Sequence, residues 1–267
     1  MINFPTCKIN LGLHILGRRD DGYHDVETAM LELPLYDILE FVESEEPAFI
    51  TSGLEIPGSG NLVLNAEAVF RKYKSFPKLS FHLHKLIPMG GGLGGGSSDA
   101  AFALKMMRDR YLPGIPNEVL KEMAATIGSD CAFFIDGGIQ FATGRGEVLE
   151  PLDLNLKNYF VVLVNLGIHV STKEAYEGVI PNPDRTPLRE ILSKPIHTWK
   201  DRLENDFEKS VFLKYPELAK IKQDLYAHGA VYASMTGSGS TLYGIFESEV
   251  QGIQWSSPVS YEAYLKL

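Results

Sequence analysis

Cysteine is scarce in this sequence of 267 residues, in which Cys7 and Cys131 are the only two. Two cysteines so far apart can form neither a disulfide framework nor a zinc site. They are typical of reduced, mostly buried residues of a cytosolic protein. The composition therefore argues against a small disulfide-stapled secreted domain and against a zinc-binding domain.

Long apolar runs and a surplus of basic residues are lacking as well. No run approaches the roughly 18 apolar residues of a membrane span, and no basic segment with an apolar core opens the chain. We therefore expect a cytoplasmic protein without a membrane partner. The net charge of −9 argues against a nucleic-acid partner, because the phosphate backbone needs a basic face. With 45% hydrophobic residues, the chain can form one large or two modest domains.

Glycine, by contrast, is concentrated in residues 88–99, Pro-Met-Gly-Gly-Gly-Leu-Gly-Gly-Gly-Ser-Ser-Asp. Residues 79–83 alternate as in a strand, and residues 99–111 carry Ala, Leu and Met at helical spacing. Glycines permit positive φ angles and close approach, and a helix start offers unpaired N–H groups to an anion. The order of strand, glycine loop and helix predicts a phosphate-binding loop. Ser97 and Ser98 could cap the helix, bind phosphate oxygen or ligate magnesium, and these roles stay open.

Three other glycine loops fit less well. Gly90-x-Gly92-x-x-Gly95 matches the dinucleotide fingerprint formally, but the match is weak evidence inside so dense a run of glycines. Residues 111–116 also break the chain where that fold needs its next strand. A Walker A loop needs a Lys before Ser97, and a protein kinase needs His-Arg-Asp and Asp-Phe-Gly segments. The sequence contains none of these.

Two charged residues have unusual surroundings. Lys8 and Asn10 project to the same face of a predicted strand over residues 7–16. Asp130 precedes an apolar run, where burial would penalise an unpaired carboxylate. Asp130 therefore needs a nearby cation, and Lys8 is the candidate. The alternative for Lys8 and Asn10 is the solvated side of a surface strand.

Together these motifs resemble the GHMP superfamily, the small-molecule kinases grouped with galactokinase, homoserine kinase, mevalonate kinase and phosphomevalonate kinase. The resemblance rests on the glycine loop, Lys8-x-Asn10, Gly22-Tyr23-His24 and Gly128-Ser129-Asp130. The doubled Gly-Gly-Gly and the Gly-Tyr-His triplet are most similar to the kinases of the non-mevalonate isoprenoid pathway. Those kinases phosphorylate the 2-hydroxyl of 4-diphosphocytidyl-2-C-methyl-D-erythritol.

The resemblance implies an α+β fold in two domains with the active site in a cleft between them. The S5-like N-terminal, ATP-binding domain would span residues 1–155, and the ferredoxin-like C-terminal domain residues 156–267. It implies ATP as phosphate donor, Mg²⁺ with undetermined protein ligands, and a small cytidyl diphosphate substrate. The oligomeric state stays open between a monomer and a weak dimer. The sequence departs from the family at Ala132, where Pro is usual.

The resemblance also implies roles for individual residues. Asp130 would be the general base toward the accepting hydroxyl, and Lys8 the catalytic cation that keeps Asp130 ionised. The ATP-binding residues would be Pro88, Met89, Gly90, Gly91, Gly92, Leu93, Gly94, Gly95, Gly96, Ser97, Ser98, Asn61, Leu62 and Lys85. The substrate-binding residues would be Asn10, Tyr23, His24, Thr172, Tyr176 and Gly237. Structural roles compete for some of them, such as a helix N-cap at Asn61, a solvated strand end at Lys85 and core packing at Tyr176.

Other functions stay open as alternatives. Another GHMP small-alcohol kinase, acting on mevalonate or homoserine, is the nearest competitor. A dinucleotide-binding oxidoreductase and a non-catalytic nucleotide-binding module are the remaining two. The Gly-Tyr-His triplet, combined with the glycine loop and the Gly-Ser-Asp segment, favours the cytidyl-substrate kinase.

Overall fold

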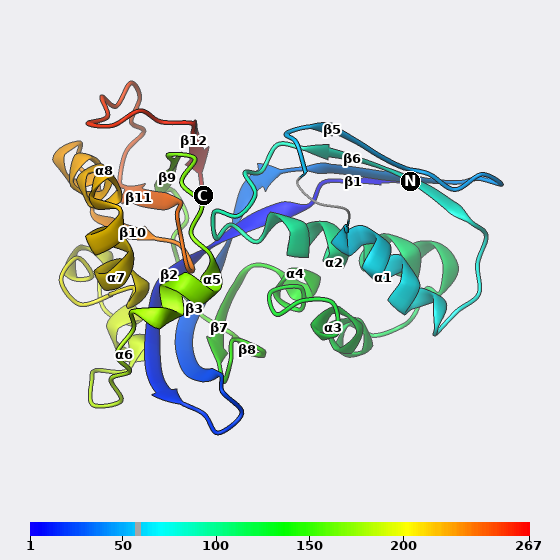
Figure 1. The fold of residues 1–267 in the computed structure, drawn as a ribbon, viewed down its shortest axis with the longest axis horizontal. Coiled ribbons are helices and arrows are strands. Elements are labelled where there is room, and N and C mark those ends of the chain that lie inside the picture. The colour runs from blue at the N-terminus through cyan, green and yellow to red at the C-terminus, as the bar shows by residue number, and fades with distance from the viewer. Residues whose placement is uncertain (57–59) are drawn as a thin grey trace. The chain divides into compact units, whose positions relative to one another are not determined.

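The computed structural model describes residues 1–56 and 60–267 (Figure 1). These residues form two compact units, neither of which is continuous in sequence. Unit 1 comprises Met1–Lys8, Leu35–Met89 and Gly94–Gly138. Unit 2 comprises Ile9–Pro34, Gly90–Leu93 and Ile139–Leu267. The units therefore divide the chain differently from the domains expected at 1–155 and 156–267, and that boundary stays a prediction.

Unit 1 contains a four-stranded sheet in the order β1-β4-β6-β5. Its strands are β1 (Ile2–Asn3), β4 (Ile38–Glu43), β5 (Phe49–Gly53) and β6 (Leu79–Lys85). β6 pairs antiparallel with β4 and parallel with β5. Alternate residues of β6, from Leu79 to Lys85, are buried, because one side of a pleated strand faces the core. The strand predicted over residues 79–83 is confirmed.

Helices cover one face of this sheet in Figure 1. They are α1 (Leu62–Arg71), α2 (Gly95–Tyr111), α3 (Asn117–Ala125) and α4 (Phe133–Asp136). α1 and α2 pack against each other, and α2 also contacts β1, β4, α3 and α4. The Ala, Leu and Met residues of α2 that were expected to pack at helical spacing are buried, among them Ala100, Leu104 and Met107. The order of strand, glycine loop and helix is thereby confirmed.

Two further sheets, in the orders β2-β3-β7-β8 and β10-β11-β9-β12, belong to unit 2 apart from the first residues of β2 and the last of β3. The first is formed by β2 (Thr6–Arg18), β3 (His24–Tyr36), β7 (Ile139–Thr143) and β8 (Val148–Pro151). The second is formed by β9 (Phe160–Asn165), β10 (Tyr232–Met235), β11 (Leu242–Phe246) and β12 (Tyr261–Lys266). β9 is central and apolar because it pairs with β11 on one side and β12 on the other.

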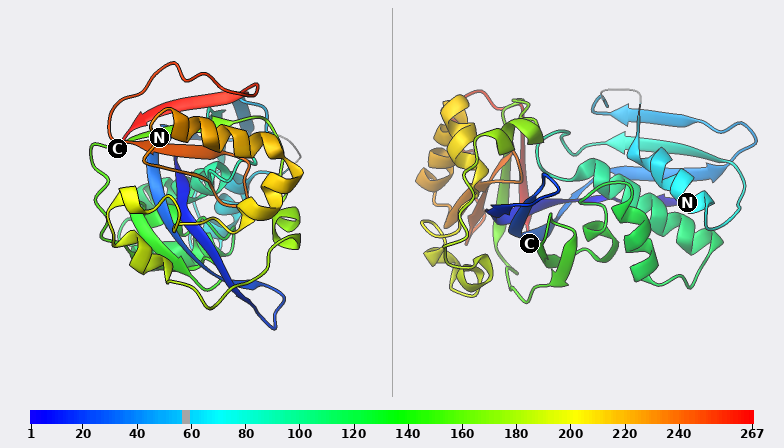
Figure 2. Two further views of the ribbon diagram at one scale, coloured as in Figure 1. Left: turned by 90° about the vertical axis from the view of Figure 1, so that its left-hand side faces the viewer. Right: turned by 60° about the horizontal axis from the view of Figure 1, so that its bottom comes forward.

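The helices of unit 2 are short, apart from the pair beside the second sheet. They are α5 (Thr172–Glu177), α6 (Leu188–Leu192), the 3₁₀ helix η1 (Ile196–Thr198), α7 (Phe207–Lys214) and α8 (Pro216–Ala227). α8 packs on β10 and β11, as the left view of Figure 2 shows. Pro216 is the first residue of α8, where its fixed φ and missing N–H do no harm.

Candidate active site

The glycine loop needs its glycines because three of them adopt left-handed backbone angles. Gly90, Gly92 and Gly94 have φ angles of 68°, 80° and 70°. Such values strain residues with a Cβ atom. A Cβ on Gly92 would also lie 2.2 Å from the carbonyl oxygen of Thr236. Sterics and backbone conformation thus explain the composition of the loop together.

The first half of the loop, Gly90–Leu93, is fixed within unit 2. The backbone N–H of Thr241 donates to Gly91 O at 3.2 Å, and the Thr236 hydroxyl donates to Gly92 O at 3.2 Å. Asn165 supports this arrangement by donating to the Thr241 hydroxyl at 2.9 Å. The glycine turn after β10 is therefore in contact with the first half of the loop.

The second half of the loop starts α2 within unit 1. Gly94 is the N-cap of this 17-residue helix, and its side-chain-free position cannot supply a capping oxygen. The first-turn N–H groups and the positive end of the helix dipole together favour an anion. Ser97 is half-buried and hydrogen-bonds with the Cys131 thiol. Ser98 is buried, and its hydroxyl has no partner among the described residues.

Lys8 and Asp130 form an ion pair within unit 1. Lys8 Nζ lies 3.2 Å from Asp130 Oδ2, and the two side chains are 4% and 33% exposed. The cation expected for Asp130 is therefore Lys8. A Cβ on Gly94 would lie 3.2 Å from Lys8 Cε, so the Lys8 side chain runs directly against the start of α2. A cation, a carboxylate and a helix N-terminus thus gather at one place.

Asp130 is positioned by the tight connection between α3 and α4. Cys131 N donates to Gly128 O at 3.1 Å, which closes a turn around Asp130. Ala132 has a φ of −62°, a value that proline also adopts, so the backbone here is compatible with the proline that is usual in the kinases the sequence resembles. Burial raises the pKa of the Cys131 thiol to about 11 and keeps it protonated.

Aromatic residues predicted to bind substrate lie together in unit 2. The rings of His24 and Tyr176 are stacked, with centroids 4.8 Å apart. Tyr176 also meets the ring of Phe207 edge-on at 4.8 Å, which holds its orientation. Tyr23 is 57% exposed, and the guanidinium of Arg145 lies 4.9 Å from its ring centroid. An exposed aromatic ring beside a cation is suited to a planar, anionic ligand.

Thr172 and Gly237 come from neighbouring segments of the same unit. Ser171 caps α5 by accepting from Glu174 N, which leaves the Thr172 hydroxyl to meet that of Ser238 at 3.3 Å. Gly237 is buried and has a φ of 55°. Asn205 donates to Gly237 O at 2.9 Å, which helps to fix the backbone of this turn.

Asn10 is buried within a polar network of unit 2. Its side-chain amide donates to the Thr28 hydroxyl at 3.0 Å. Its Oδ1 lies 3.3 Å from the Thr236 hydroxyl, which shares its one hydrogen between Asn10 Oδ1 and Gly92 O. The Tyr243 hydroxyl donates to Asn10 O at 2.8 Å. These contacts connect β2 to the turn that holds Gly92, so Asn10 has a structural position beside the loop whether or not it touches substrate.

The residues predicted at the adenine side take definite positions in unit 1. Asn61 caps α1 by accepting from Val63 N at 2.8 Å, which confirms the helix-cap alternative. Leu62 lies against the first turn of α2, 3.8 Å from where a Cβ on Gly96 would be. Lys85 is not a solvated strand end, because it is only 1% exposed. Its ammonium instead contacts Asp37 and Asp99.

Sequence reasoning missed Asp37, Asp99, Thr236 and Asn165. An acid at Asp37 between apolar strand residues was the one signal available, and it resembles the signal that identified Asp130. Nothing local marks Thr236 or Asn165, whose contacts join segments more than 70 residues apart. Within residues 1–56 and 60–267, no cluster of three His, Cys, Asp or Glu side chains is arranged to hold a metal ion.

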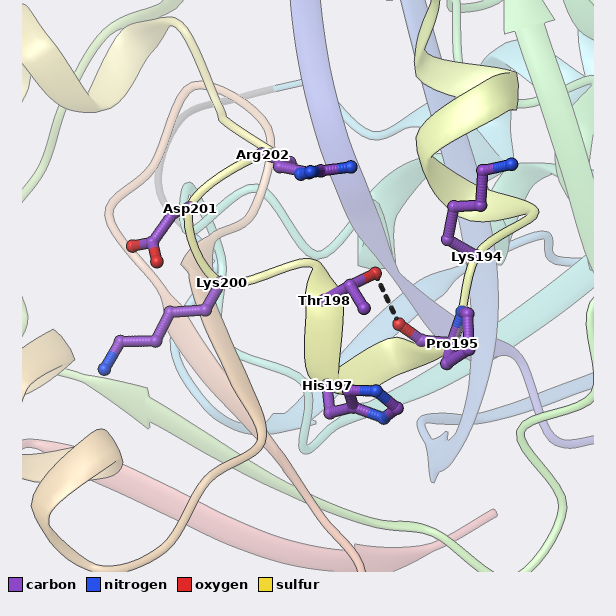
Figure 3. Close-up of a pocket in the computed structure, with 7 residues that line it drawn as sticks. All are labelled: Lys194, Pro195, His197, Thr198, Lys200, Asp201 and Arg202. Carbon is purple, nitrogen blue, oxygen red and sulfur yellow. Dashed lines mark hydrogen bonds between the residues drawn. The ribbon is translucent and has the colours of Figure 1, made fainter.

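A separate pocket of about 390 Å³ lies beside η1 in unit 2 (Figure 3). It is lined by Lys194, Pro195, His197, Thr198, Lys200, Asp201 and Arg202. The Thr198 hydroxyl donates a hydrogen bond to Pro195 O. Lys200 Nζ lies 4.6 Å from the ring centroid of Tyr226. None of the predicted site residues lines this pocket.

In the described part of the chain, no helix is long and apolar enough to cross a membrane.

Comparison with known proteins matches both halves of the GHMP kinase pattern. The GHMP kinases N terminal domain matches residues 61–138, and the GHMP kinases C terminal family matches residues 185–256. A 4-diphosphocytidyl-2-C-methyl-D-erythritol kinase of Cytophaga hutchinsonii is 45% identical over 93% of each chain. One of Parabacteroides distasonis is 47% identical over 92% of each.

Solved structures agree with this match. A crystal structure of 4-(cytidine 5'-diphospho)-2C-methyl-D-erythritol kinase superposes with a TM-score of 0.79. It is 32% identical and covers 92% of this chain and 90% of its own. Mevalonate kinase of Methanococcus jannaschii has a TM-score of 0.68 at 16% identity, with the same coverages, and shares the fold. The α+β GHMP kinase fold is therefore confirmed.

Proposed function

Since this chain belongs to the 4-diphosphocytidyl-2-C-methyl-D-erythritol kinase family of the GHMP kinases, we propose that it phosphorylates the 2-hydroxyl of that compound with ATP. The product would serve isoprenoid synthesis by the non-mevalonate route. One observation carries the proposal most directly: the Lys8–Asp130 pair lies against the helix start that is suited to phosphate. An ATP-dependent kinase needs this combination, whereas a dinucleotide-binding oxidoreductase does not.

The loop from Pro88 to Ser98 would hold the phosphates of ATP. Positive φ angles at three glycines and the start of α2 support this assignment, because they provide N–H donors without side-chain obstruction. Asn61 and Leu62 would lie on the adenine side, supported by the contact between Leu62 and the first turn of α2. Phosphoryl transfer depends mainly on such positioning and on charge neutralisation.

Asp130 would accept the proton of the substrate hydroxyl as its oxygen forms a bond to the γ-phosphorus. The bond from that phosphorus to the ADP oxygen breaks at the same centre. Lys8, 3.2 Å from the carboxylate, would offset negative charge on the transferring group. The burial of Lys8 strengthens this effect, because little water screens it.

Mg²⁺ would neutralise charge on the phosphate oxygens when bound with ATP. Of the two serines left open by the sequence, Ser97 is the better candidate to face it. Ser97 is half-buried, whereas the Ser98 side chain is enclosed in unit 1 with no exposed surface. Ser97 would have to exchange its contact with Cys131 for the ion.

The cytidyl end of the substrate would be bound by residues of unit 2. His24 and Tyr176 supply a ring pair, and the exposed Tyr23 with Arg145 nearby suits a base next to a diphosphate. The hydroxyl of Thr172, the backbone of Gly237 and the side chain of Asn10 would contact the same molecule. Asn10 also holds the turn beside them. We further propose a cytoplasmic location, supported by two buried free cysteines.

A coupled ADP-release assay tests this function. The purified chain is offered 4-diphosphocytidyl-2-C-methyl-D-erythritol, mevalonate and homoserine in separate reactions, and only the cytidyl compound should give turnover. Turnover with mevalonate or homoserine instead would favour another GHMP kinase. Asp130→Asn should lower kcat by about 10²- to 10⁴-fold, because the base is lost. Asp136→Asn is the matched control, since Asp136 pairs with Lys121 at the surface of α4. Near-normal turnover by Asp130→Asn would refute the assigned role.

A further inference from the structure

Three ionisable side chains are buried together at the start of α2. Lys85 is 1% exposed, Asp37 is fully buried, and Asp99 is 2% exposed. Lys85 Nζ donates to Asp37 Oδ2, and also to Asp99 Oδ2 at 2.8 Å. All three belong to unit 1. We call Lys85, Asp37 and Asp99 the buried triad.

The buried triad connects the segments that precede and follow the glycine loop to the residue between β3 and β4. Lys85 ends β6, and Asp99 stands in the first turns of α2. Asp37 lies between β3 and β4 and accepts from the backbone N–H groups of Leu86 and Ile87, at 2.6 and 2.9 Å. The residues that enter the loop are thus tied to Asp37, and the helix that leaves it is tied to Lys85 through Asp99.

The Lys85 ammonium also lies directly against the loop. A Cβ on Gly95 would be 3.2 Å from Lys85 Nζ, so the ammonium packs against the first residue of α2. Its two carboxylate partners take two of its three donors. Because the ammonium contacts Asp37, Asp99 and the start of α2, it supports the backbone that would bind phosphate and does not point toward a ligand.

Electrostatics explain why the triad holds together. Burial alone would lower the pKa of Lys85, but the attraction of Asp99 and Asp37 outweighs it and raises that pKa. The lysine therefore stays charged. Burial, together with the neighbouring Asp37, raises the pKa of Asp99 to about 7 against the attraction of Lys85. The triad therefore carries up to one net negative charge, which the positive end of the α2 dipole stabilises. Removing Lys85 alone leaves two buried carboxylates without a cation, which is strongly destabilising.

Resting on the proposed kinase function, we propose that Lys85 is a positioning residue of the nucleotide site: through Asp99 and Asp37 it fixes the start of α2 and the entry of the glycine loop, without contacting the nucleotide. This role differs from direct nucleotide binding by the lysine. The two roles make opposite predictions for a variant in which both the ammonium and one carboxylate are removed.

The decisive variant is Lys85→Met/Asp99→Asn. It keeps one net negative charge at the site, and the new amide can donate to Asp37, because the side chains of Asp99 and Asp37 are within hydrogen-bonding reach. We expect Lys85→Met alone to lower the melting temperature and to weaken MgADP binding at least tenfold. The double variant should recover the melting temperature and bind MgADP within threefold of the unmodified chain, measured by titration calorimetry.

A folded double variant that still binds MgADP more than tenfold weaker would overturn the proposal, because the lost ammonium would then be a nucleotide contact. If the double variant does not fold, Asp99→Ala decides. It retains Lys85 but cuts its connection to α2, so MgADP binding should weaken at least fivefold, and unchanged binding would refute the positioning role. Lys121→Met/Asp136→Asn removes a surface pair and should change neither readout.

The readout is independent of catalysis. If the unmodified chain binds MgADP but shows no turnover with any of the three alcohols, the proposed function fails, while the affinities of the variants can still be compared. If turnover is present and the double variant recovers neither stability nor affinity while Asp99→Ala binds normally, only the positioning role fails.

Discussion

The most informative test of the fold's energetics concerns His14, in the middle of β2. The imidazole is fully buried, and neither ring nitrogen has a hydrogen-bond partner among the described residues. Burial lowers the pKa of His14 from 6.5 to about 4, and the positive charge of Arg185 adds to this effect. Asp206 and Glu204 oppose it, and Lys209 contributes slightly in the same direction as Arg185.

The sign of the pH effect follows from these two pKa values. Below pH 6.5 the unfolded chain binds a proton at His14 that the folded chain does not, so stability falls as pH falls toward 4. The loss amounts to about 2.5 kcal/mol at pH 4.5 and approaches about 3.4 kcal/mol at lower pH. Above pH 6.5 both states are neutral at this residue, and the effect vanishes.

We therefore expect His14→Leu to stabilise the protein increasingly as pH falls. At pH 7.5 the gain should be about 1 kcal/mol, from removing buried polar atoms that lack partners. At pH 4.5 the gain should be larger by about 2.5 kcal/mol. Urea unfolding of both proteins at pH 7.5, 5.5 and 4.5 measures this difference and cancels the titration of carboxylates common to both.

His197 is exposed, so His197→Leu is the control. Its effect on the free energy of unfolding should not change with pH. A His14→Leu gain that is the same at all three pH values would show that the imidazole titrates alike in both states, and it would refute this reasoning.

Two further predictions concern the site. Gly92→Ala should lower the melting temperature by several degrees more than Gly96→Ala, since a Cβ at Gly92 meets Thr236 O at 2.2 Å with φ at 80°, whereas one at Gly96 meets nothing closer than 3.8 Å; equal melting temperatures in a thermal scan would contradict this. His24→Ala should raise KM for the cytidyl substrate about tenfold, by loss of a stacking partner worth roughly 1–3 kcal/mol, and should leave KM for ATP within twofold. Steady-state kinetics in which only KM for ATP rises would contradict the assignment of His24 to the cytidyl substrate.

The local elements of the site follow from the sequence because short-range physics determines them. A loop rich in glycine between a strand and a helix can be recognised without tertiary information, since backbone freedom and helix polarity are local properties. The pairing of Asp130 with Lys8 could also be anticipated, because a carboxylate before an apolar run needs a cation and few were available. The ion pair found at 3.2 Å agrees with that argument.

The support around the loop could not be predicted in this way. Lys85 has the sequence context of a strand end, where solvent exposure is the ordinary expectation. Its burial depends on Asp37, 48 residues earlier, and on Asp99, 14 residues later. Likewise, the sequence supports a helix cap and a ligand contact at Asn61 equally well. In the structure its side chain accepts a hydrogen bond from Val63 N, which shows the cap. Which polar residue faces a ligand and which faces the protein is decided by contacts distant in sequence.

The hydrogen bonds of the first half of the loop support the proposal that it binds phosphate. Thr241 N and the Thr236 hydroxyl bind the carbonyl oxygens of Gly91 and Gly92. In a trans peptide the N–H points opposite to the C=O, so the N–H groups of Gly92 and Leu93 point away from these donors. Protein groups thus bind the carbonyl oxygens of Gly91 and Gly92, which agrees with the proposal that the N–H groups of the loop face a phosphate. Thr236 can approach this closely only because residue 92 has no Cβ, so the glycine that frees the backbone is also the one that orients its amides.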